Sequence, residues 1–581
     1  MTLLRSLLPL VAASVLIGRV LAETIGPVAD LVVHNAVLSP DGFSRSVSIA
    51  GDSVSGPLIV AQKGEVMKIN VVNNLNDPSM IQSTSIHWHG LLLNNGFAWA
   101  DGPAFITQCP IVKGNKFLYE LPTVDQAGTF WYHSHLSVQY CDGIRGPMVV
   151  YDPNDPFADL YDVDNEGTVI TLADWYHEKA LKLAHELPDH DSVLINGLGR
   201  YKDGPRAPLA VVQVEQGKRY RMRVLNIGCQ PDFWFHIDKH AMKVIEADGV
   251  NHQPVDTEGF RIFAGQRYSY ILEANQPVDN YWIRSEPENG RGGFEDGINS
   301  AILRYIGAPE QEPADSDWEP SKWLDERDLH PLENPGAPGE PVPGGVDHAI
   351  NLDFSTSSNE FMINDVKFES PSLPVLLQVL SGAFRPDQLL PKGSVYPLPS
   401  NATIEITMTG AGKKGWEADT TASLMYDSIL CICTAYGLIP PDPLSAGEAY
   451  QRFFFFFFTP QHTFDVVRVA GSDTYNYQNP VRRDVVNSGK GGDEVTIRFV
   501  TDNTGPWFLH CHIDWHLETG FAAVFAEAPE QWEAEINPPR MCPSRLIDSV
   551  VFCLIVNGGL SHLAAWEELC PIYASLPPGE L

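Results

Sequence analysis

The chain has 581 residues, too many for one hydrophobic core, and the usual size of a domain favours three. Its 44% hydrophobic and 19% charged residues are ordinary for a globular protein, while 47 glycines and 45 prolines indicate many turns and favour an all-β fold. The formal net charge of -34 excludes nucleic acid and anionic membranes as partners, because both would repel such a surface.

The N-terminus has the pattern of an export signal. Arg5 is followed by the apolar run Leu7 to Gly18 and then by Val20-Leu21-Ala22, small residues of the kind that signal peptidase cleaves after. The run is too short to span a bilayer, which argues against a membrane anchor. We therefore expect residues 1–22 to be a signal peptide and the protein to be secreted and extracellular.

Export permits disulfides and glycosylation. The chain has nine cysteines, so one is left over if the others pair. Asn401-Ala402-Thr403 is a glycosylation sequon, which makes Asn401 the candidate acceptor.

From Leu31 onward, short β-branched and aromatic runs alternate with turn clusters, as in Val66 to Val72 and Val495 to Phe499. This alternation predicts stacked β-sandwiches. Composition shifts near Tyr151-Asp152-Pro153 and across the stretch Pro309 to Gly345 indicate linkers. The predicted domains are residues 23–152, 153–322 and 323–581.

Two segments of the third domain, residues 411–461 and 540–564, do not match their surroundings. The first ends in six consecutive phenylalanines, Phe453 to Phe458, and the second contains the apolar run Val550 to Val556. Neither has the alternation of a strand or the period of a helix. One hypothesis is that both segments are translated intron or misjoined exon text, because six Phe codons form a pyrimidine-rich run like the one that precedes a splice acceptor. The alternative is a real surface insertion.

Four places in the chain hold histidines at metal-ligand spacing: His87-Trp88-His89, His133-Ser134-His135, His510-Cys511-His512, and His516. Two histidines separated by one residue on a strand point the same way, so each pair can present two imidazoles to one metal cluster. The Cys511 side chain must face opposite to its neighbours, and a single thiolate among histidines is typical of a blue-copper centre.

The alternative explanation is that these histidines are ordinary packed or surface residues. For an isolated histidine, that explanation is the better one. Here seven of the 18 histidines fall in these four places. We therefore predict a copper protein in which the residues His510-Cys511-His512 link two metal sites through a few covalent bonds.

Four longer strings carry a family resemblance: Ser83 to Gly90, Trp99 to Pro103, Gly128 to His135 and Gly505 to Glu518. In these strings, and over nearly its whole length apart from the two odd segments, the sequence resembles the fungal-type laccases, which are multicopper oxidases. The resemblance implies three cupredoxin-like Greek-key β-sandwich domains. It also implies four copper ions, with a type 1 copper in the third domain and a trinuclear cluster between the first and third.

The resemblance implies a role for each candidate residue. Cys511 and His516 would bind the type 1 copper, and Phe521 would take its axial position without ligating. His87 would bind the type 2 copper, and the type 3 pair would be bound by His89, His133, His135, His510 and His512. Asp101 and Asp484 resemble the acids that supply protons near the cluster, although turn and cap roles are an equal alternative.

The implied activity is one-electron oxidation of phenols and aromatic amines, coupled to reduction of oxygen to water, with lignin-related aromatics as substrates. Another multicopper oxidase, such as a ferroxidase or ascorbate oxidase, is the alternative enzyme. The resemblance also pairs Cys109 with Cys570 and Cys141 with Cys229, and we expect a monomer.

The sequence departs from the family at two places. The family has a strand His-Pro-X-His-Leu-His-Gly-His-Thr-Phe that supplies three copper ligands, but only His462-Thr463-Phe464 of its tail remains, and His462 matches the histidine that is not a ligand. This chain could therefore be copper-deficient or inactive. The family's substrate-contacting Cys-Asp-Pro-Asn is replaced by Cys229-Gln230-Pro231-Asp232, which leaves Gln230 or Asp232 to contact substrate.

Overall fold

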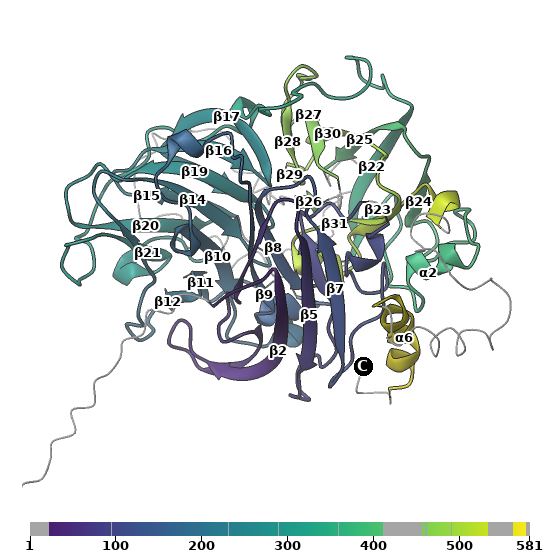
Figure 1. Ribbon diagram of the computed structural model, residues 1–581, viewed down its shortest axis with the longest axis horizontal. Helices are drawn as coiled ribbons and strands as arrows, with labels where there is room; N and C mark the ends of the chain where they lie inside the picture. The colour runs from purple at the N-terminus through teal and green to yellow at the C-terminus, as the bar shows by residue number, and fades with distance from the viewer. Residues whose placement is uncertain are drawn as a thin grey trace, which may run out of the picture.

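The computed structural model describes residues 23–410, 456–458, 462–532 and 562–576, apart from positions 95, 187, 231, 289, 358, 359 and 490. Strands dominate the described chain and helices are short, so the predicted all-β class is confirmed. The strands form six sheets, and each third of the chain contributes two (Figure 1).

The first third forms a four-stranded sheet, β3-β2-β5-β7, and a five-stranded sheet, β1-β4-β9-β8-β6. Along β5, buried and more exposed residues alternate, as expected for a strand with one face on a core. Every residue of β8 is buried, because this strand is covered on both faces. The strands are β1 (Thr24–Ile25), β2 (Val28–Leu38), β3 (Arg45–Ala50), β4 (Leu58–Gln62), β5 (Val66–Asn74), β6 (Ile86–His89), β7 (Lys116–Pro122), β8 (Gly128–Ser134) and β9 (Arg145–Tyr151).

The second third forms a seven-stranded sheet, β12-β11-β10-β14-β19-β16-β17, and a five-stranded sheet, β13-β21-β20-β15-β18. Its strands are β10 (Val169–Trp175), β11 (Ser192–Ile195), β12 (Leu198–Tyr201), β13 (Val211–Val214), β14 (Arg219–Asn226), β15 (Phe233–Ile237), β16 (Met242–Ala247), β17 (Val250–Thr257), β18 (Gly259–Ile262), β19 (Arg267–Glu273), β20 (Asn280–Pro287) and β21 (Ser300–Tyr305).

The last third forms a six-stranded sheet, β23-β22-β25-β30-β27-β28, and a five-stranded sheet, β24-β32-β31-β26-β29. Its helices are α2 (Val375–Leu380), α3 (Asp514–Glu518) and α6 (His562–Ala574). The strands are β22 (His348–Ser357), β23 (Glu360–Ile363), β24 (Val395–Leu398), β25 (Thr403–Thr409), β26 (Phe456–Phe458), β27 (Phe464–Arg468), β28 (Val481–Arg483), β29 (Val485–Asn487), β30 (Glu494–Val500), β31 (Gly505–Cys511) and β32 (Ala522–Glu527).

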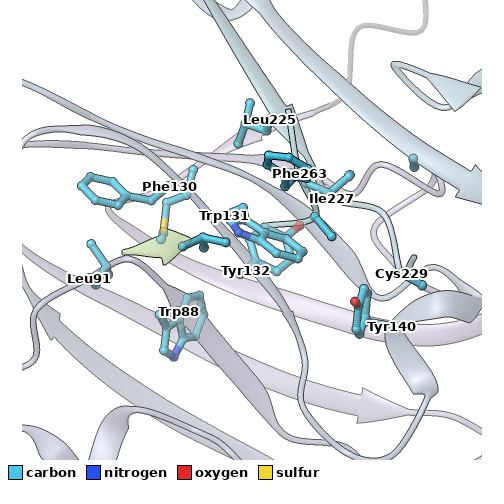
Figure 2. Close-up of a cluster of buried hydrophobic side chains, with 14 of the residues drawn as sticks. Trp88, Leu91, Phe130, Trp131, Tyr132, Tyr140, Leu225, Ile227, Cys229 and Phe263 are labelled. Carbon is cyan, nitrogen blue, oxygen red and sulfur yellow. The ribbon is translucent and has the colours of Figure 1, made fainter. Parts of the chain in front are cut away.

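One large hydrophobic core runs through all three thirds. Figure 2 shows the part where side chains of β8, among them Trp131 and Tyr132, are buried together with Ile227 and Phe263 of the second third. Continuous packing of this kind holds neighbouring sandwiches in a fixed relation to one another.

Most of the odd segments 411–461 and 540–564 lies outside the described residues, so the intron hypothesis stays a prediction. The described parts are β26 and the start of α6. The predicted signal peptide, residues 1–22, also lies outside them. Among the described residues, no helix combines the length and apolar character needed to cross a membrane.

Within the described residues two disulfides are present, Cys109–Cys570 and Cys141–Cys229, the pairs that the family resemblance implies. The first joins residues 461 positions apart and ties α6 to the first third of the chain. Asn401, the candidate glycosylation site, is exposed just before β25.

We expect the double variant Cys109→Ser/Cys570→Ser to unfold at lower denaturant concentration, losing about 3–5 kcal/mol, because this bridge closes a very long loop of the unfolded chain. Chemical denaturation followed by tryptophan fluorescence measures the difference. Adding a thiol reductant to the unmodified protein should lower the midpoint at least as far, because it also opens Cys141–Cys229. Equal midpoints for the variant and the unreduced protein would contradict the stabilising role.

Candidate metal centre

Strands β6 and β8 bring four of the predicted histidines together. The two strands pair antiparallel with His87 opposite His133 and Ile86 opposite Ser134. His89 and His135 follow at the two-residue spacing that returns to the same face of a strand. The imidazole centroids of His87 and His133 are 5.4 Å apart, and those of His87 and His135 are 5.5 Å apart.

Strand β31 brings two more histidines from the far end of the sequence. The Nε2 atom of His510 lies 3.2 Å from Nε2 of His135, and the Nε2 atom of His512 lies 3.2 Å from Nδ1 of His89. Six predicted ligands from the first and last thirds thus form one cluster. The narrow space between them is lined by His133, His135, His510, His512 and Cys511, among others.

The cluster has the chemistry of a copper site. The ligand atoms of His87, His89 and His133 all lie within 4.8 Å of one another. Backbone carbonyl oxygens of Asp101, Ser134 and Cys511 lie 2.9 Å from Nδ1 of His87, His133 and His510 respectively. Each of these Nδ1 atoms therefore carries the proton and donates, which leaves Nε2 to bind a metal.

Burial keeps His89, His133, His510 and His512 neutral, as metal binding requires. It is the main reason that the pKa of His89, His133 and His512 lies well below the ordinary value for histidine, and it lowers the pKa of His510 to about 4. The Nε2 atom of His133 is buried and has no hydrogen-bond partner among the described residues. An unsatisfied buried nitrogen is costly unless a ligand such as a metal completes the site.

Cys511 and His516 form a second site beside the cluster. The Sγ atom of Cys511 lies 3.5 Å from Nδ1 of His516, and both side chains are buried. Among the described cysteines, Cys511 is the one that forms no disulfide. Phe361 stacks on His516 with ring centroids 4.2 Å apart, and Phe521 is fully buried against Phe361. A thiolate and an imidazole inside an apolar shell fit a type 1 copper without a strong axial ligand.

Both predicted acids lie beside the histidine cluster. The Asp101 carboxylate is buried with Oδ1 3.2 Å from Nδ1 of His87. Asp484 lies with Oδ1 3.7 Å from Nε2 of His89 and is held by a bidentate ion pair with Arg267, at 2.6 and 2.7 Å. Burial raises the pKa of Asp484 to about 6, although Arg267 opposes the shift.

The second third contributes two residues that the sequence did not indicate. Arg267 donates to the carbonyl oxygens of Thr129 and Gly265 as well as to Asp484, so it joins all three thirds. Gly265 has a φ of +84°, and a Cβ there would lie 2.9 Å from His512 and 3.1 Å from His89. A larger residue would be strained and would push on two ligands. Neither residue belongs to a motif, so no local signal pointed to them.

We expect Arg267→Met to destabilise the protein by roughly 3–5 kcal/mol, because it leaves the buried carboxylate of Asp484 without its ion-pair partner. Thermal and denaturant unfolding would measure the loss. The double variant Arg267→Met/Asp484→Leu removes both partners and should recover part of it. If the double variant is less stable than the single one, unpaired charge is not the cause.

The missing ligand strand has a backbone counterpart. Strand β26 pairs antiparallel with β31, placing Phe458 opposite His510 and Phe457 opposite Cys511. Counting back from His462, the family string puts its three ligand histidines at positions 455, 458 and 460, where this chain has Phe, Phe and Pro. The Nε2 atom of His462 lies 2.8 Å from the Glu527 carboxylate, so this remaining histidine is hydrogen-bonded to an acid.

The two candidate substrate residues differ in their environment. Gln230 is half-buried, and its Oε1 lies 3.2 Å from the Tyr176 hydroxyl. Asp232 is buried and paired with Arg261, which also contacts Glu288. Because its carboxylate is already used, Asp232 is the weaker candidate for substrate contact.

Comparison with known proteins identifies the family. Three multicopper oxidase family models match residues 32–155, 166–308 and 461–531. The chain is 50% identical to laccase-4 of Trametes villosa over 97% of both chains, and 49% identical to a laccase of Pycnoporus cinnabarinus over the full length of both. The crystal structure of a laccase from Botrytis aclada superposes with a TM-score of 0.75 at 26% identity, covering 96% of this chain and 94% of that one.

These matches confirm the predicted resemblance and the cupredoxin-like Greek-key fold. The chain belongs to the multicopper oxidase family and is an oxidoreductase of the laccase type.

Proposed function

We propose that the chain oxidises phenols and aromatic amines one electron at a time and reduces oxygen to water, with lignin-related aromatics as substrates. The observation that carries this proposal is the position of Cys511 between His510 and His512. Its thiol lies against His516, while its two neighbours contact histidines of the first third. Electrons entering at the Cys511–His516 site have a short covalent route to the histidine cluster.

Each residue has a defined part in this function. Copper, when bound, supplies the one-electron redox steps between the aromatic donor and oxygen. Cys511 and His516 would hold the type 1 ion, and His87 the type 2 ion. The remaining histidines of the cluster, His89, His133, His135, His510 and His512, would hold the type 3 pair. Asp101 and Asp484, each within 4 Å of a ligand imidazole, are placed to hold and transfer protons.

The family architecture has four copper ions, and this chain has ligands for only part of that set. Residues 455, 458 and 460 lack imidazoles, so the type 1 site keeps two ligands and the type 2 site keeps His87. We expect fewer than four ions per chain and slow oxygen reduction, since metal affinity depends on the full ligand set.

The proposed setting is extracellular. The sequence supports it through the export pattern of residues 1–22 and the sequon at Asn401, and the structure through two disulfides, which persist in oxidising compartments. We propose a monomer with domains at residues 23–152, 153–322 and 323–581.

Purified protein tests the function directly. Copper content, the blue absorption band of a thiolate-bound copper, and oxygen uptake with a methoxyphenol or with ferrous iron are measured on the same sample. Blue colour with faster uptake on the methoxyphenol supports the proposal. A copper-loaded protein that consumes oxygen only with ferrous iron would contradict it.

A further inference from the structure

A narrow cleft in the second third of the chain is lined by basic side chains. Strands β11 and β12 pair antiparallel with Ser192 opposite Tyr201, so the residues just before β11 and just after β12 meet at the open end of this hairpin. His190 and Lys202 are those residues, and both line the cleft. The loop between β20 and β21 forms the opposite wall and contributes Arg291. None of the described residues that line this cleft is a predicted copper ligand.

His190 supplies a buried nitrogen that lacks a partner. The residue is 4% exposed, and its Nε2 atom has no hydrogen-bond partner among the described residues. Gly290 packs directly on the imidazole, where a Cβ would collide with the ring. Burial lowers the pKa of His190, although three nearby carboxylates oppose the shift, so the ring is neutral at neutral pH. A neutral imidazole keeps one N–H group to donate, and a buried donor without an acceptor is costly.

Two cations lie on the solvent side of the cleft. Lys202 and Arg291 are exposed, and neither makes an ion pair within the described part of the chain. The charge of Arg291 is close enough to His190 to help lower the pKa of the imidazole. Asn299 donates from Nδ2 to the carbonyl oxygen of Arg291 at 2.8 Å, which fixes this part of the loop. In a chain with a formal net charge of -34, two unpaired cations beside one cleft form a local site of attraction for an anion.

The other charged side chains that line the cleft already have partners. Arg200 is buried, donates from Nε to the carbonyl oxygen of Ala207 at 2.7 Å and pairs with Glu312 at 2.8 Å. The Asp191 carboxylate accepts from the backbone N–H of His177 at 2.8 Å. The groups left for a ligand are therefore the buried imidazole and the two exposed cations.

The size of the cleft restricts the ligand. The space inside it is about as large as one water molecule. One oxygen atom of a ligand therefore fits beside His190, and the rest of the ligand stays at the solvent side. A carboxylate suits this arrangement, because one of its two coplanar oxygens can accept from Nε2 of His190 while the other meets Lys202 or Arg291. A tetrahedral oxyanion is wider and fits less well.

We propose that this cleft binds a small carboxylate anion, which accepts from Nε2 of His190 and pairs with Lys202 or Arg291. The bound anion joins the β11–β12 hairpin to the loop between β20 and β21, and it stabilises the folded chain by mass action. The site shares no residue with the copper centres, so it stands or falls independently of the proposed oxidase function.

Formate, the smallest carboxylate, is the probe. Its dissociation constant is measured by ligand-observed NMR on the full chain at constant ionic strength. We expect saturable binding that His190→Leu weakens at least about ten-fold, as the loss of one hydrogen bond to a charged group does. The double variant Lys202→Gln/Arg291→Gln should weaken binding at least about three-fold, because it removes both charges from the solvent side. Lys116→Gln, at an exposed lysine that begins β7, is the matched control and should keep the dissociation constant of the parent.

Three outcomes would overturn the proposal. The first is a parent chain without saturable formate binding. The second is an equal dissociation constant in the parent and the variants, which is also what formate bound at a copper ion would give. The third is tighter binding of phosphate than of formate, which would rule out a carboxylate site. If His190→Leu does not fold, the double variant at the exposed positions 202 and 291 still decides, and an unchanged constant there overturns the proposal.

Discussion

The triple variant Phe455→His/Phe458→His/Pro460→His is expected to bind up to four copper ions per chain and to reduce oxygen at least about 100-fold faster than the parent. These are the positions where the family string has its ligand histidines. The change of a single group that merely supports a ligand costs about 10–100-fold in metal affinity, and the absence of a ligand costs more. Strand β26 already pairs with β31, so a histidine at position 458 starts from a strand that lies directly beside His510.

Copper analysis, absorption spectra and oxygen uptake on parent and variant measure the gain. The matched control is Phe454→His/Phe457→His, which adds imidazoles to the same run at positions that are not ligands in the family string. Equal copper content in the triple variant and the control would show that the run does not occupy the register of the ligand strand.

Cys511→Ser is expected to abolish the blue band, lower the copper content by one ion and reduce oxidation of aromatic donors to background. A serine hydroxyl is not ionised at neutral pH and does not replace a thiolate ligand. The route from the His516 site to His510 and His512 runs through this residue. Because serine is close to cysteine in size, the buried position should tolerate it with little change in folding.

The measurements are visible absorption, copper content and steady-state oxidation in both the parent and the triple-histidine background. Cys553→Ser, which changes a cysteine outside every predicted site, should leave all three unchanged. Persistence of the blue band in Cys511→Ser would mean that another residue binds the type 1 ion.

The pairing of histidines on one strand face could be predicted from the sequence because that geometry is local. A His-X-His pair on a strand places both imidazoles on one face whatever the rest of the fold does. The structure places His87 opposite His133 on paired strands, a pairing between segments that this local reasoning does not supply. The meeting of His89 with His512, 423 residues apart, was available only from the family resemblance.

The supporting residues could not be predicted, since their roles depend on contacts between distant parts of the chain. Arg267 lies on β19 and reaches Asp484 in the last third, 217 positions away. The sequence left Gln230 and Asp232 as equal candidates, and the ion pair between Asp232 and Arg261 separates them.

The pairing of β26 with β31 has a consequence for folding in the absence of the ligand histidines. Strand pairing uses backbone N–H and C=O groups, which every residue but proline offers alike, so three phenylalanines can complete the ladder beside His510 and Cys511. A chain that lacks metal ligands on this strand can therefore keep the backbone ladder of its sheet, so folding of the third domain and loading with copper are separate properties.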